Sequence, residues 1–302
     1  MTIFTSMRKT RVILSIDGGG IRGVLPLVIL DYLNAAVKKH GISKSINEAI
    51  DLFAGTSTGA IISSALMLKK KNGNPLYFPD NIIDLYAARG PQIFNKARPE
   101  NKNEFPLKLI LENNFGSTKM ADLDKRFAFI SYDERMNEPF VFTNRLEGFR
   151  NVSLAKILLA CSAVKDYFPP IELGGHLLSD GIKTTKNPAL TAYHHAKVYF
   201  PNDVYLIISL GTGKMNDELR DDVEINAENI DKELVKQEKA DKDLIYYRFQ
   251  PDIKEGSFEM DDTDPENINA LIRDGELFVR ENRLIFNTLI KEWKKSIGTS
   301  KL

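Results

Sequence analysis

The chain has 302 residues, of which 41 are basic and 41 acidic, so its formal net charge is zero. Hydrophobic residues make up 43% and charged residues 27%, a balance that allows one large globular core or two small ones. A balanced charge argues against nucleic-acid binding, which usually needs a basic excess. The single cysteine, Cys161, excludes a disulfide within the chain and suits a cytoplasmic protein.

Two segments bear on membrane association. The first residues, MTIFTSMRKTR, contain no apolar core and no cleavage site, so we expect no signal peptide. The most apolar helical stretch, GAIISSALML, is about half as long as a membrane-spanning helix needs to be. We therefore expect any contact with a membrane to be peripheral.

Periodic apolar residues predict alternating strands and helices along the chain. We expect strands at 12–16, 51–54, 139–143 and 204–210, and helices at 24–39, 58–70, 80–88, 152–160, 186–197 and 265–293. This alternation is typical of an α/β fold with a central, mainly parallel sheet flanked by helices. We expect a tail at 1–10, a core at 11–213, and a charged loop and helical part at 214–302 packed on the same domain.

The C-terminal part carries two further patterns. Residues 215–243 are rich in mixed charge and poor in aromatic residues, which predicts a solvated loop or an exposed helix. Beyond them, a helical stripe predicts core positions at Leu277, Leu284, Phe286, Leu289 and Trp293.

The stretch RVILSIDGGGIRG, residues 11–23, satisfies the G-x-G-x-x-G pattern of dinucleotide-binding loops. It also has the expected context, because an apolar strand precedes it and an apolar-periodic helix follows. The pattern alone leaves two interpretations open: a cofactor site, or backbone N–H groups that face another negative charge.

A second motif, GTSTG, places Gly55, Ser57 and Gly59 between a short apolar strand and an apolar helix. That context is required of a nucleophile elbow, in which a sharp turn exposes the serine hydroxyl and the helix N-terminus favours negative charge. The alternative is an ordinary strand-to-helix turn in which Ser57 or Thr58 caps the helix.

The second motif bears on the first. A dinucleotide site needs an acidic residue at the end of the next strand, about 20 positions past the last glycine. Residues 38–49 contain no strand-like run, and strand 51–54 leads into GTSTG instead. An oxyanion hole fits better: Gly18, Gly19 and Gly20 can present successive N–H groups, with Arg22 as an anchor for the loop.

A serine nucleophile needs a base. The histidines His40, His176, His194 and His195 all fall in predicted helices or a strand, and none stands on a loop after a strand. The remaining candidate is Asp180, which with Gly181 follows an apolar run. An Asp-Gly pair is also an ordinary turn signal, so this assignment stays open on the residues alone.

These motifs together resemble the patatin-like phospholipase family. DGGGIRG resembles the family's oxyanion loop, GTSTG its nucleophile elbow and SDGI (179–182) its Asp-Gly motif. ACSAVKDYFPP (160–170), the NP at 187–188 and SLGTG (209–213) resemble the segments that surround these motifs. The resemblance covers roughly residues 11–213.

The resemblance implies a three-layer α/β fold and a Ser-Asp dyad without metal or cofactor. Ser57 would be the nucleophile, Asp180 the base and Gly18, Gly19 and Gly20 the oxyanion donors; the supporting motif residues are Arg22, Gly23, Gly55, Gly59 and Gly181. The reaction would be hydrolysis of acyl esters in phospholipids or other acyl lipids through an acyl-enzyme. The alternative is a non-catalytic or signal-activated lipid-binding effector.

Three residues depart from the family pattern: Ile182, where Gly or Ala is usual, and Lys165 and Asp166, where small or apolar residues are common. These departures bear on the shape of the pocket. A further segment, 74–94, has aromatic residues and isoleucines that would either cap the pocket, touch lipid or pack as an ordinary helix.

Overall fold

The computed structural model describes residues 8–93, 106–165, 167–215 and 221–298. Within them an eight-stranded sheet has the order β5-β6-β3-β2-β1-β7-β8, with β4 beside β3. The central pairs β3-β2, β2-β1, β1-β7 and β7-β8 are parallel, whereas β4, β5 and β6 pair antiparallel. The expected α/β fold with a mainly parallel sheet is confirmed.

The strands are β1 (Thr10–Ile16), β2 (Leu52–Thr56), β3 (Arg126–Asp133), β4 (Glu138–Thr143), β5 (Ile171–Leu173), β6 (His176–Asp180), β7 (Val204–Leu210) and β8 (Leu244–Phe249). The α-helices are α1 (Val24–Lys39), α2 (Ile46–Ala49), α3 (Thr58–Met67), α4 (Pro79–Ile93), α5 (Pro106–Phe115), α6 (Leu154–Cys161), α7 (Ala189–Tyr199), α8 (Asp222–Ala240), α9 (Pro265–Glu281) and α10 (Arg283–Gly298).

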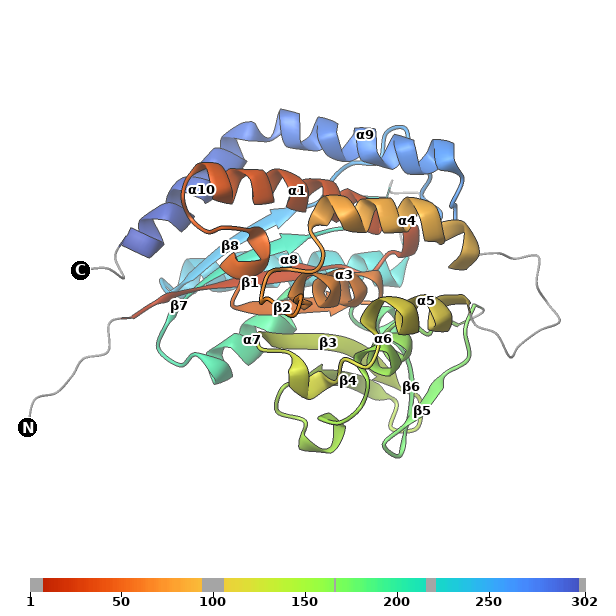
Figure 1. Ribbon diagram of the computed structural model, residues 1–302. Helices are drawn as coiled ribbons and strands as arrows, with labels where there is room; N and C mark the ends of the chain where they lie inside the picture. The colour runs from red at the N-terminus through yellow and green to blue at the C-terminus, as the bar shows by residue number, and fades with distance from the viewer. Residues whose placement is uncertain (1–7, 94–105, 166, 216–220, 299–302) are drawn as a thin grey trace, which may run out of the picture.

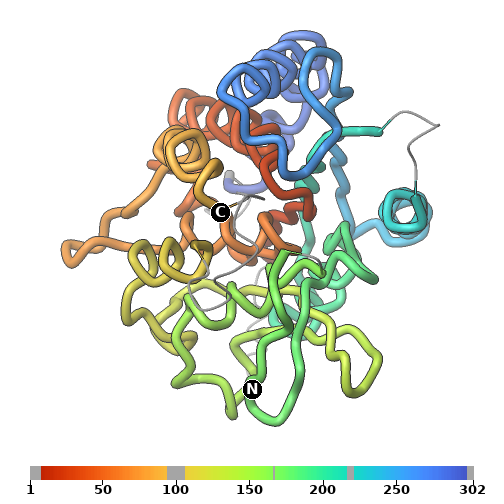
Figure 2. The backbone as a smooth tube through the Cα atoms, turned by 90° about the vertical axis from the view of Figure 1, so that its right-hand side faces the viewer, coloured from red at the N-terminus to blue at the C-terminus, as the bar shows by residue number. Residues whose placement is uncertain are grey.

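Helices cover both faces of the sheet (Figure 1). Leu14 and Ile16 of β1 join a core with α1, α3, α6 and α10, whereas Ile13 joins a second core with α7 and α8. Figure 2 shows α8 (teal) on the opposite side of the strands from α1 and α9. Because β1 is buried on both faces, its sequence is a continuous apolar run rather than an alternating one.

Several predicted elements need correction. The sequence pattern did not predict β3, β5, β8, α2 or α5, and the single helix expected at 265–293 is two helices, α9 and α10. The backbone N–H and side-chain amide of Asn282 both donate to the Phe278 carbonyl, which ends α9. Within its described part, the charged tract forms helix α8, whose charged side chains are mostly exposed or half-buried while Ala227 and Leu234 are buried. Residues 1–7, 94, 166 and 216–220 of the predicted segments lie outside the described residues.

The change of direction at Asn282 also changes which side chains are buried. Phe286, Leu289 and Trp293 are in the core as expected, but Leu284 is 83% exposed, so its assignment to the core was wrong. The Phe286 ring stacks on Phe249 of β8 with 4.4 Å between ring centroids.

In the described part of the chain, one helix, Gly20–Lys39, is long and apolar enough to cross a membrane by length and composition alone. This helix is longer than the GAIISSALML stretch and lies earlier in the chain. Of its most apolar 18 residues, 78% are buried inside the protein. Its apolar surface therefore packs against the sheet and neighbouring helices.

The α10 packing can be tested by truncation. Replacing Phe286 with alanine leaves a cavity against Phe249, so we expect the free energy of unfolding in urea to fall by about 3–5 kcal/mol. Leu284→Ala, two residues away on the exposed side of α10, should change it by less than about 0.5 kcal/mol. Equal losses in the two variants would contradict this packing.

Candidate active site

Ser57 stands on a sharp turn between the end of β2 and the start of α3. Its backbone has φ 52° and ψ −123°, a left-handed conformation that a residue other than glycine rarely adopts. The side chain makes no helix cap, although the residue occupies the capping position. This geometry favours the elbow interpretation over the ordinary capped turn, because a capping serine normally has extended backbone angles.

The flanking glycines of the elbow are required by close backbone packing. A Cβ on Gly55 would come within 2.3 Å of the Ala60 nitrogen, and one on Gly59 within 2.1 Å of the Ile16 carbonyl oxygen at the end of β1. Any side chain at either position would push α3 away from the sheet. The elbow and the glycine loop after β1 are therefore in direct contact.

The glycine loop is held by hydrogen bonds at several points. Gly18 donates its N–H to the Lys186 carbonyl (3.1 Å), and its own carbonyl accepts from the Thr212 hydroxyl (2.6 Å). Ile21 donates its N–H to the Met260 carbonyl (2.9 Å). Because the Gly18 N–H is already engaged, the expected set of three oxyanion donors needs correction.

The N–H groups of Gly19 and Gly20 have no hydrogen-bond partner among the described residues, so these two remain available as donors. Both positions need glycine for lack of space. A Cβ on Gly19 would come within 2.3 Å of the Thr212 hydroxyl, and one on Gly20 within 2.2 Å of the Met260 carbonyl oxygen. Gly20 also has φ +58°.

Asp180 ends β6, and its carboxylate is almost fully buried beside Ser57. One oxygen, Oδ1, accepts the Ile182 N–H at 2.8 Å, whereas buried Oδ2 has no hydrogen bond of ordinary geometry among the described residues. Burial raises the pKa of Asp180 to about 7, and the nearby Ser57 hydroxyl and the Ile182 N–H only partly oppose this rise. At neutral pH the carboxyl can therefore both take up and release a proton.

Further contacts connect the Asp180 turn to the elbow and to β3. The Thr56 hydroxyl donates to the Thr185 carbonyl (2.8 Å). A Cβ on Gly181 would come within 2.7 Å of the Ile130 backbone, which explains the glycine after the aspartate.

The departures from the family pattern have different consequences. The Ile182 side chain packs against the glycine loop at Gly18. A Cβ atom added to Gly18 would lie 3.2 Å from the Ile182 Cδ1 atom. Lys165 is exposed and does not line the cavity beside Ser57. Asp166 lies outside the described residues.

An apolar cavity opens beside Ser57 and extends among α3, α4, α5 and the segment that follows α6. Its unfilled space is about 940 Å³, including the part open to solvent. Its wall includes the apolar residues Ile61, Ala65, Ile82, Leu85, Ile93, Leu107, Ile110, Leu111, Phe115, Val164, Phe168 and Met260. The predicted segment 74–94 thus contributes the packed helix α4, whose Tyr86 hydroxyl bonds to the Thr58 hydroxyl next to Ser57.

The histidines do not complete the site. None of the four lines the cavity, and His176 binds Asp133 at 2.5 Å on the neighbouring hairpin. Arg22 is buried, and its Nε and Nη1 atoms have no hydrogen-bond partner among the described residues. No group of three His, Cys, Asp or Glu side chains able to hold a metal ion occurs in the described part of the chain.

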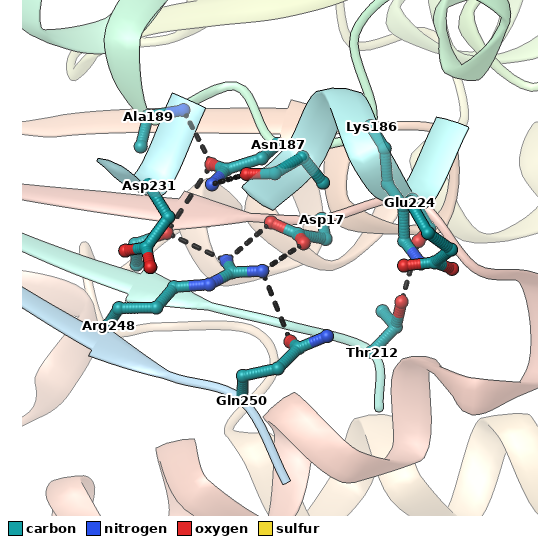
Figure 3. A network of polar contacts seen from close by, with 12 residues as sticks. Asp17, Lys186, Asn187, Ala189, Thr212, Glu224, Asp231, Arg248 and Gln250 are labelled. Carbon is teal, nitrogen blue, oxygen red and sulfur yellow. Dashed lines mark hydrogen bonds and ion pairs between the residues drawn. The ribbon is translucent and has the colours of Figure 1, made fainter. Parts of the chain in front are cut away.

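A buried polar network that the sequence pattern did not predict lies under the glycine loop (Figure 3). Arg248 of β8 binds the Asp17 carboxylate through both of its terminal nitrogens, at 2.8 and 2.6 Å. Lys186 pairs with Glu224 of α8 in the same region. Asp17 was visible as the first letter of DGGG, but Arg248 lies on a strand that the sequence pattern did not predict.

The family model for patatin-like phospholipases matches residues 14–193, more than half of the chain. The chain belongs to this family. It is 27% identical to patatin group J-1 of Solanum tuberosum over 242 residues, which cover 70% of this chain and 62% of the patatin. It is 29% identical to patatin-like protein 2 of Arabidopsis thaliana over 242 residues, covering 67% of this chain and 59% of that protein.

A solved structure, human GIVD cytosolic phospholipase A2, aligns with 95% of this patatin-like chain and 60% of its own, at a TM-score of 0.53 and 9% identity. At that identity the likeness concerns the fold alone. The chain spans about three fifths of the length of the curated relatives named above.

The raised pKa of Asp180 predicts a stability effect that depends on pH. The pKa of Asp180 is higher in the folded state than its unfolded value of about 3.9, so ionisation of Asp180 opposes folding. The stabilisation by the protonated carboxyl is fully present at low pH and is lost as the pH rises through 7. Asp180→Asn keeps the oxygen that accepts the Ile182 N–H and removes this cost. We expect its advantage over the wild type in urea unfolding to be on the order of 2 kcal/mol larger at pH 8 than at pH 5.

Asp84→Asn, an exposed change on α4, serves as the control and should show the same difference from the wild type at both pH values. An Asp180→Asn advantage that does not grow with pH would show that Asp180 ionises at an ordinary pKa.

Proposed function

We propose that the protein is a serine esterase of the phospholipase A type, which hydrolyses acyl ester bonds of phospholipids or other acyl lipids. The observation that carries the proposal is the strained Ser57 turn, which places the hydroxyl between a buried carboxyl without a strong partner and an apolar cavity. Membership of the patatin-like family supports the same reaction class.

In the first half of the reaction, Ser57 Oγ attacks the ester carbonyl carbon while Asp180 accepts the hydroxyl proton. The carbonyl oxygen becomes an oxyanion, which the N–H groups of Gly19 and Gly20 stabilise; one such donor is typically worth about 2.7–4 kcal/mol. The bond to the alcohol oxygen then breaks, and Asp180 returns the proton to the leaving alcohol.

The second half releases the acyl-enzyme. Water attacks the acyl carbonyl carbon and gives a proton to Asp180, the oxyanion forms again at the same donors, and the bond to Ser57 Oγ breaks. The proton returns to Ser57, and a fatty acid leaves. A carboxyl with a pKa of about 7 suits this exchange, because general bases work best with a pKa near the operating pH.

The lining of the cavity supports an acyl lipid as the substrate class. Its wall is formed mainly by aliphatic and aromatic side chains, so it favours an acyl chain over a peptide or sugar. We propose that a phospholipid or another acyl lipid places one acyl chain between α3, α4 and α5 while its headgroup stays outside. This arrangement is compatible with a cytoplasmic protein that contacts a membrane peripherally.

The main alternative is an effector that binds lipid without turning it over, or only after a signal. A fluorophosphonate probe separates the two, because it reacts covalently only with an activated serine. A dinucleotide site has less support, since β2 ends at Thr56 and no acidic side chain stands at its end.

The dyad predicts a specific loss of activity. Ser57→Ala and Asp180→Asn should each lower the release of fatty acid from phospholipid vesicles and p-nitrophenyl esters by about 10³-fold or more. Ser64 is a buried serine on α3, the helix that follows Ser57, and its hydroxyl has no hydrogen-bond partner among the described residues. Ser64→Ala should therefore keep near wild-type activity. Activity in Ser57→Ala would exclude Ser57 as the nucleophile.

The cavity predicts a dependence on chain length. Ala65 lies on α3 two helical turns beyond Ser57, about 12 Å along the axis. Ala65→Trp should narrow the cavity there, so kcat/KM for long-chain p-nitrophenyl esters should fall about 10-fold or more while that for the acetate changes little. Ala88→Trp on the exposed side of α4 is the matched control. A uniform loss over all chain lengths would place the acyl chain elsewhere.

A further inference from the structure

Arg248 lies outside the segment that matches the family model, on the strand β8 at the edge of the sheet. β8 does not pair with β1; the strand β7 lies between them. The Arg248 side chain nevertheless crosses β7 and reaches Asp17, the residue between β1 and the glycine loop (Figure 3).

The contact is geometrically demanding. The Asp17 carboxylate is fully buried, and each of its oxygens accepts from a different terminal nitrogen of Arg248. A planar guanidinium that binds a carboxylate in this way fixes its orientation as well as its position. Asp17 precedes Gly18 directly, so fixing Asp17 restricts where the loop begins.

Arg248 is itself held in place from two sides. Its Nη1 donates to the Ser209 hydroxyl of β7 (2.9 Å), and its Nη2 donates to Gln250 Oε1 (3.1 Å). Gln250 in turn donates to the Gly213 carbonyl (3.0 Å), in the loop after β7. The same loop carries Thr212, which donates to the Gly18 carbonyl. The side chains of Arg248 on β8 and of Gln250 just after it thus support the glycine loop by two routes.

Stability alone is a weak reason for such a pair, because apolar residues of similar volume often stabilise a protein at least as well as a buried ion pair. An oxyanion hole, in contrast, requires its donors to be within about 0.5 Å of the productive position. Of the N–H groups at Gly18, Gly19 and Gly20, only the last two are free to donate, so their placement depends on how the loop is held.

We propose that Arg248 is a positioning residue for catalysis: by binding Asp17 it holds the Gly19 and Gly20 N–H groups in the oxyanion-binding geometry. The inference rests on the proposed esterase function. It predicts that loss of Arg248 slows formation of the tetrahedral intermediate and leaves substrate binding in the apolar cavity largely unchanged.

The test compares Arg248→Met with Arg248→Lys, and with the double variant Asp17→Asn/Arg248→Met, which leaves no unpaired buried charge. The measurements are kcat and KM for a p-nitrophenyl ester, the rate of Ser57 labelling by a fluorophosphonate, and the melting temperature. We expect Arg248→Met to lower kcat and the labelling rate about 10- to 100-fold with KM within about twofold. Arg248→Lys should recover part of the loss.

The double variant separates positioning from stability. If positioning is the role, its melting temperature returns toward the wild type while kcat stays low; recovery of both would overturn the proposal. Hydrogen exchange gives a readout without catalysis, because amides in a peptide covering 14–24 should exchange faster in both Met variants. Unchanged exchange together with wild-type kcat in folded Arg248→Met would also overturn it.

Arg11→Met is the matched control, since Arg11 lies on β1, the strand that ends beside Asp17, and pairs with Asp203 at the opposite end of the strands. It should lower the melting temperature without changing kcat at a temperature where the variant is folded. A wild-type protein that is neither labelled nor active would overturn the esterase proposal itself, whereas an active wild type with an equally active Arg248→Met overturns only the role of Arg248.

Discussion

The contact between Gly59 and the Ile16 carbonyl is the constraint on which the rest of the site depends. The start of α3 lies so close to the end of β1 that no side chain fits at Gly59. This contact brings the nucleophile turn against the glycine loop, and it is possible because β1 and β2 are parallel neighbours whose carboxyl ends share an edge. Asp180 reaches the same edge from β6, which runs antiparallel to β3.

The buried charged groups at this edge of the sheet differ in whether they have a partner of opposite charge. Asp17 is paired with Arg248 and Lys186 with Glu224, so each of these charges has a partner that offsets part of its burial. Asp180 has no cationic partner in the described structure, and burial therefore raises its pKa to about 7. Both oxygens of Asp17 accept hydrogen bonds from Arg248, whereas Oδ2 of Asp180 has no hydrogen bond of ordinary geometry among the described residues.

The motifs could be recognised in the sequence because each is short and its glycines belong to a turn formed by neighbouring residues. The strand before GTSTG, the helix after it and the Asp-Gly turn could all be predicted from neighbouring residues. β8 could not, because it follows a charged tract and its burial comes from pairing with β7, a contact distant in sequence. The engagement of the Gly18 N–H was hidden for the same reason, since its acceptor, Lys186, is far along the chain.

The division into a core at 11–213 and a C-terminal part at 214–302 describes the sequence pattern better than it describes the site. Met260 accepts the Ile21 N–H and approaches Gly20, and Arg248 binds Asp17, so two contacts of the glycine loop come from beyond residue 213. The three motifs contain the groups to which the proposed reaction is assigned, but the position of the loop also depends on residues outside the segment 14–193 that matches the family model. Changes in the C-terminal part can therefore alter the site without touching any motif residue.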